Sequence, residues 1–62
     1  MCRYQFLNIE TCHIVIADTH DAASQLGLTE AAVIDATRDV NLGAPSSIRV
    51  EDRTYEVLPL LS

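Results

Sequence analysis

Hydrophobic and polar residues alternate near both ends of the chain, and this pattern predicts strands there. Residues 4–9 are aromatic and branched with a partial period of two, which is typical of a β-strand. Residues 48–51 and 54–57 alternate in the same way, and Asp52-Arg53 between them fits the connection of an antiparallel hairpin. Pro59 has no N–H to donate to a ladder, so we expect the last strand to lie at an edge of its sheet.

The middle of the chain has the pattern of two short helices. Asp18 or Thr19 is the expected N-cap of a helix over residues 20–26, because a short side-chain oxygen accepts a hydrogen bond from an unpaired backbone N–H. Gly27 is expected to end this helix, since glycine adopts positive φ without a steric penalty. Thr29 is the expected N-cap of a second helix, with Glu30 in its first turn.

The second helix has the clearest periodicity in the chain. Its apolar stripe, at spacing i, i+3, i+4 and i+7, consists of Val33, Ala36, Thr37 and Val40. Residues 10–17, by contrast, fit two structures. Their β-propensity favours continuation of the first strand, and a short helix packed under the rest of the chain is equally compatible.

Residues 21–33 have the spacing of a helix-turn-helix. Two short helices that cross steeply need a small residue where they touch, which is Ala23, and a residue of positive φ in the turn, which is Gly27. Leu26, Leu28 and Val33 are expected to fill the wedge between the helices. A plain helical hairpin joined by glycine is the alternative.

The helix pair, the strand at residues 46–50 and the returning strand at residues 55–60 together resemble the Cro repressor of phage lambda and its relatives. The resemblance implies a single α+β domain over residues 1–62, with an N-terminal strand, three short helices and a C-terminal β-hairpin. It makes residues 10–17 the first helix and residues 29–40 the recognition helix.

The resemblance also implies a homodimer in which the last strand pairs with its copy and Leu60 enters the partner's core. The implied dimer interface consists of Tyr55, Val57, Leu58, Pro59 and Leu60. The implied DNA- or partner-binding face of the recognition helix consists of Thr29, Glu30, Ala31, Ile34, Asp35 and Arg38. Members of the family usually present amides, hydroxyls and lysines on this face, and this sequence departs from them with two carboxylates and an isoleucine.

Charge makes DNA binding difficult for this chain. Its 62 residues include four arginines, no lysine and nine carboxylates, for a net charge of −5, and affinity for DNA comes mainly from Lys and Arg.

Two functions are therefore expected. One is a Cro-like transcriptional regulator of operator DNA. The other is an acidic protein-binding module, such as an inhibitor, antirepressor or DNA mimic, that uses the same helix or a β-edge to bind a host or phage protein. A solvated acidic surface without a partner is the simplest interpretation of Glu30, Asp35, Asp39 and Glu51.

Other chemistry has little support in the sequence. The spacing of Cys2, Cys12, His13 and His20 does not match zinc sites, so we expect no metal and no cofactor. No group orients a catalytic pair, so neither an enzyme nor a small-molecule substrate is expected. The longest apolar run, residues 14–17, is too short for a membrane span. The two cysteines and the lack of a secretion signal favour a reducing cytoplasm.

Overall fold

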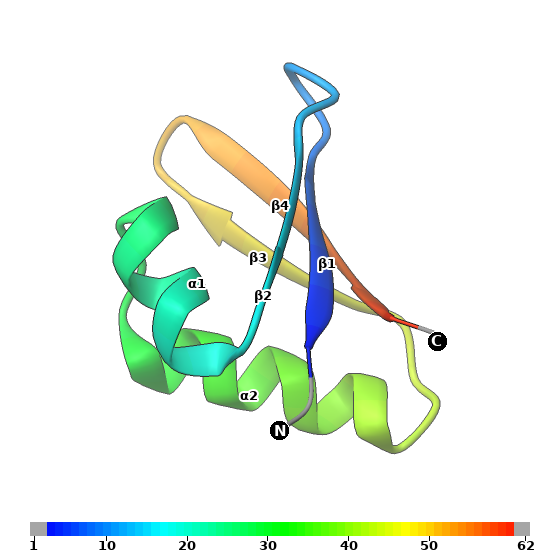
Figure 1. Cartoon of the computed structure of the whole chain (residues 1–62). Helices are drawn as coiled ribbons and strands as arrows, with labels where there is room; N and C mark the ends of the chain where they lie inside the picture. The colour runs from blue at the N-terminus through cyan, green and yellow to red at the C-terminus, as the bar shows by residue number, and fades with distance from the viewer. Residues whose placement is uncertain (1–2, 61–62) are drawn as a thin grey trace.

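A four-stranded antiparallel sheet carries two helices on one face in the computed structural model, which describes residues 3–60 (Figure 1). In chain order the elements are β1 (Tyr4–Asn8), β2 (Ile14–Ala17), α1 (Thr19–Leu26), α2 (Glu30–Asn41), β3 (Ser46–Val50) and β4 (Arg53–Pro59). The strands lie in the order β2-β1-β4-β3. The first and last strands are therefore central neighbours, and each belongs to a hairpin whose other strand is an edge of the sheet.

The expected α+β class is confirmed, but the arrangement of one N-terminal strand and three helices is wrong. Residues 10–17 form a turn followed by β2 instead of a helix. The turn is closed by Asn8, whose Oδ1 accepts from the Glu10 N–H at 2.9 Å and whose carbonyl accepts from the Cys12 N–H at 2.7 Å. The three consecutive β-branched residues of β2 then favour an extended backbone.

The helix boundaries follow the capping residues, as the sequence predicts. Asp18 Oδ1 accepts from the Asp21 N–H at 2.8 Å, and α1 ends at Gly27, whose φ is 68°. Thr29 Oγ1 accepts from the Ala32 N–H at 3.3 Å, so only a short turn separates the two helices. These contacts satisfy N–H groups that a helix leaves unpaired at its start.

The core lies between the helices and the inner face of the sheet. Phe6, Val33 and Val57 are its largest fully buried side chains, and Phe6 lies opposite Val57 on one side and Val15 on the other. The predicted apolar stripe of α2 is buried along its whole length. Since side chains alternate along a strand, the neighbouring residues of β1 and β4 lie on the outer face, which the helices do not cover.

The expected edge position of the last strand is also wrong, because β4 pairs with β1 on one side and β3 on the other. The backbone directions explain how Pro59 is tolerated. The Ile9 N–H donates to the Thr54 carbonyl at 3.1 Å, so the backbone N–H and C=O groups of Thr54 point toward β1. These groups alternate in direction along an antiparallel strand, so the backbone groups of Val57 and Pro59 point toward β3. The ladder with β3 ends at the pair Ser46–Val57. The nitrogen of Pro59 therefore faces a position where β3 offers no partner.

Candidate functional site

The expected binding face of α2 is exposed to solvent over all six of its residues, from Thr29 to Arg38. Ile34 is half exposed, at 50%, in the middle of this face. Arg38 Nη2 lies 3.2 Å from Asp35 Oδ1, and Glu30 Oε1 lies 3.1 Å from Nδ1 of His20 on α1. The single arginine of α2 is thus already paired with a carboxylate of the same helix.

The other arginines of the chain lie outside α2. Arg3 precedes β1, and Arg49 lies on β3. Arg53 of β4 turns toward the core, where its Nη1 donates to the Leu26 carbonyl at 3.2 Å and to the Tyr55 hydroxyl at 3.1 Å. The exposed face of α2 therefore has little positive charge to offer a phosphate backbone.

A groove of about 480 Å³ runs between α2 and β3. The helix contributes a stripe at spacing i, i+3, i+4 and i+7, which consists of Ala32, Asp35, Ala36 and Asp39. The strand side includes Ser47, Ile48 and Arg49. The two alanines are small enough to leave the groove open. The two carboxylates, one helical turn apart, outnumber Arg49 on the strand side and give the groove a net negative charge.

The outer edge of β3 borders this groove and offers backbone groups for pairing. Tyr55 and Val57 direct their N–H and C=O groups toward β3, so their partners Ile48 and Ser46 direct theirs toward β4. By the same alternation, the N–H and C=O groups of Ser47 and Arg49 point outward, away from the sheet. An unpaired edge of this kind is a template for an added strand.

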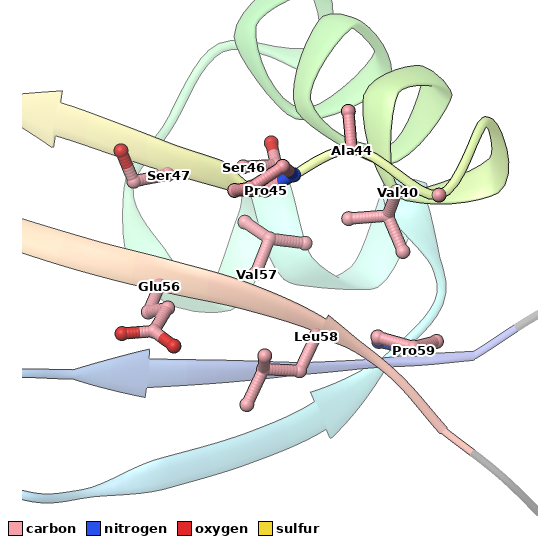
Figure 2. A pocket seen from close by; sticks show the side chains of 10 residues that line it. Val40, Ala44, Pro45, Ser46, Ser47, Glu56, Val57, Leu58 and Pro59 are labelled. Atoms are coloured by element: carbon pink, nitrogen blue, oxygen red, sulfur yellow. The ribbon is translucent and has the colours of Figure 1, made fainter.

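A second groove, of about 590 Å³, continues from the first at the start of β3. The two share Pro45, Ser46 and Ser47. Figure 2 shows Val57 pointing toward Val40 of α2, while Glu56 and Leu58 point to the other side of β4. Because the ladder with β3 stops at Val57, this end of the groove lies beside Leu58 and Pro59, which pair with β1 but not with β3.

The residues expected at a dimer interface are divided between the core and the surface. Tyr55 and Val57 are buried inside their own domain, at 4% and 2% exposure. Leu58 and Leu60 are half-buried, and Pro59 is exposed. Since β4 has a strand on both sides over residues 55–57, it has no free edge there to pair with a copy of itself.

Asp35 and Asp39 were expected as acidic surface residues, but their position beside β3 was not predicted from the sequence. The spacing of residues 32, 35, 36 and 39 indicates the helical wall of the groove, because it places two alanines and two carboxylates on one stripe of α2. The contribution of β3 had no such signal, since nothing local indicates that this strand packs beside α2.

Within residues 3–60, no group of three His, Cys, Asp or Glu side chains is placed to hold a metal ion. Cys12 is exposed and His13 lies next to it, while Cys2 falls outside the described residues. No helix among the described residues is long and apolar enough to cross a membrane. No family model, curated protein or solved structure matches this chain.

Proposed function

We propose that this protein is an acidic protein-binding module that holds an extended, basic segment of its partner in the groove between α2 and β3. The segment adds as a strand to the outer edge of β3, and its Lys or Arg side chains face Asp35 and Asp39. The observation that carries the proposal is this combination of outward backbone groups and carboxylates along one groove.

Each part of the groove supplies a different component of recognition. The outward N–H and C=O groups of Ser47 and Arg49 supply main-chain hydrogen bonds, which give affinity without regard to sequence. Asp35 and Asp39 supply specificity, because a guanidinium or ammonium group there gains charge-assisted hydrogen bonds. Arg38 already occupies one side of Asp35, which leaves Asp39 as the carboxylate with no ion-pair partner within residues 3–60.

The net charge of −5 supports the same direction of recognition. An acidic domain attracts basic partners over long range and repels nucleic acid. A cytoplasmic location is part of this proposal. The homodimer through the last strand is not part of it, because β4 is paired on both sides over residues 55–57.

The proposal is tested with a fluorescein-labelled peptide of alternating arginine and valine, whose arginines share one face when it is extended. We expect fluorescence anisotropy to show binding to the wild-type chain and at least tenfold weaker binding to the double variant Asp35→Asn, Asp39→Asn. The matched control is Glu51→Gln, Asp52→Asn, which removes the same charge from the β3–β4 turn and is expected to change affinity less than threefold. Equal weakening by both double variants would show general charge attraction and overturn the groove proposal.

The backbone component has its own variant, Ser47→Pro. This change removes an outward-facing N–H and leaves the ladder between β3 and β4 intact, because Ser47 directs no hydrogen bond toward β4. We expect the variant to fold normally and to bind the peptide at least tenfold more weakly. Unchanged binding would contradict strand addition.

A second candidate, a helix-turn-helix regulator that binds operator DNA through α2, is favoured by one observation. The two helices are joined by a short turn with a capped start to α2, and in Figure 1 α1 runs across α2 rather than alongside it. Mobility shifts of mixed-sequence duplex DNA across a salt series separate the two candidates. Binding that weakens linearly with log salt supports the regulator, and no binding at low salt excludes it.

A further inference from the structure

The opposite edge of the sheet, β2, differs from β3 in lacking the features that protect an edge. Its sequence, Ile-Val-Ile-Ala, contains no charge, no proline and no glycine. Natural edge strands are usually shielded by lysines, prolines or bulges, because an unshielded edge pairs with other strands. Ile14 and Ile16 are nevertheless 58% and 49% exposed.

The backbone of β2 leaves two residues available for pairing. The Asn8 N–H donates to the His13 carbonyl at 2.9 Å, so His13, Val15 and Ala17 direct their N–H and C=O groups toward β1. Ile14 and Ile16 therefore direct theirs outward, and within residues 3–60 these groups have no partner.

We infer that β2 pairs with β2 of a second copy of this chain in an antiparallel, two-fold arrangement centred on Val15. In this register Ile14 of each copy lies opposite Ile16 of the other, and each such pair exchanges hydrogen bonds in both directions. All the outward backbone groups of Ile14 and Ile16 are then satisfied. A closed two-fold pairing of this kind uses the same patch on both copies.

The side chains favour a second copy over an unrelated strand. Ile14 and Ile16 lie on the outer face of the sheet, opposite Leu7 and Gln5 of β1, with Leu58 of β4 beyond Gln5. Antiparallel pairing places isoleucine against isoleucine across the new junction, so the apolar strip of one copy continues into the other.

The ends of the strand do not bring like charges together. In the same register His13 of one copy lies opposite Ala17 of the other, and Cys12 lies opposite Asp18. The paired segment, residues 13–17, contains no Asp, Glu, Lys or Arg, so two chains of net charge −5 meet at this edge without placing like charges opposite each other. The edge of β3, by contrast, carries a charged residue, Arg49, and borders the acidic groove.

Sedimentation velocity over a range of protein concentrations tests the dimer with a matched pair of variants. Ile16→Lys places a charge on the edge, and Ile34→Lys makes the same change at a similarly exposed position of α2. We expect the wild-type chain and Ile34→Lys to dimerise equally, and Ile16→Lys to dimerise at least tenfold more weakly. A wild-type chain that stays monomeric at the highest concentration, or equal dimerisation of all three proteins, would overturn the inference.

Crosslinking tests the register independently of stability. In a background with Cys2→Ser and Cys12→Ser, one chain carries Ile14→Cys and another carries Ile16→Cys. Residues of a hydrogen-bonded pair have Cα atoms about 5.5 Å apart, within the range that a disulfide spans. Under oxidised glutathione, the mixture is expected to form severalfold more disulfide-linked dimer than either chain alone. Equal yields in the three samples would exclude this register.

Discussion

Phe6 is the residue whose replacement tests the packing of the domain most severely. Its side chain is fully buried, at 0% exposure, and contacts the Tyr4 ring edge-on with the ring centroids 6.4 Å apart. Replacing a buried Phe by Ala costs about 3–5 kcal/mol, from lost burial and from the cavity that remains. A chain of 62 residues has a total stability of about 3–9 kcal/mol at the usual value per residue. The Phe6→Ala variant should therefore lose about a third or more of its free energy of unfolding.

Urea denaturation followed by far-ultraviolet circular dichroism measures this loss. Phe6→Leu keeps most of the side-chain volume and should cost about 1–2 kcal/mol. This smaller loss of unfolding free energy can still be measured if Phe6→Ala is already unfolded in water. The control is Ile34→Ala, where the side chain is half exposed and a loss below about 1 kcal/mol is expected. The packing would be refuted if Phe6→Ala unfolded within about 1 kcal/mol of the wild-type protein.

Three further substitutions test the connections around the helices. Thr29→Ala removes the cap on the Ala32 N–H and should cost about 1 kcal/mol of unfolding free energy in urea, whereas Thr29→Ser should cost little. Gly27→Ala should lower the melting temperature because φ is 68° there, and Gly27→Asn should lower it less; no atom lies within 4 Å of the added Cβ, so the effect measures backbone strain alone. Arg53→Met removes the hydrogen bond to the Leu26 carbonyl and should cost about 1–2 kcal/mol, with the control Arg49→Met near zero.

The helices were predictable because their signals are local. A cap and its acceptor lie within three residues of each other, and Gly27 terminates α1 through its own backbone. The C-terminal hairpin was also predictable from local signals, because hydrophobic and polar residues alternate within each of its two strands. Residues 10–17 lacked such a signal, because β-branched residues there were compatible with both a strand and a short packed helix. Residues 14–17 form a strand because they pair with β1, and this pairing requires the whole N-terminal hairpin to form.

The position of β4 could not be predicted from Pro59 alone. The rule that proline avoids central strands applies to the side on which its nitrogen faces a partner. Here that side lies beyond the end of β3, because the ladder stops at the pair Ser46–Val57, and no local pattern contains this long-range relation. The groove between α2 and β3 depends on long-range packing in the same way, so only its acidic residues were visible in the sequence.

The most direct test of the proposed binding groove is a two-dimensional amide NMR titration of the ¹⁵N-labelled chain with the arginine-valine peptide. We expect the largest shift changes at Asp35, Asp39, Ser47 and Arg49, on both walls of the groove between α2 and β3. Shift changes confined to the exposed face of α2, or spread evenly over the acidic surface, would contradict the binding of an extended basic segment at this edge.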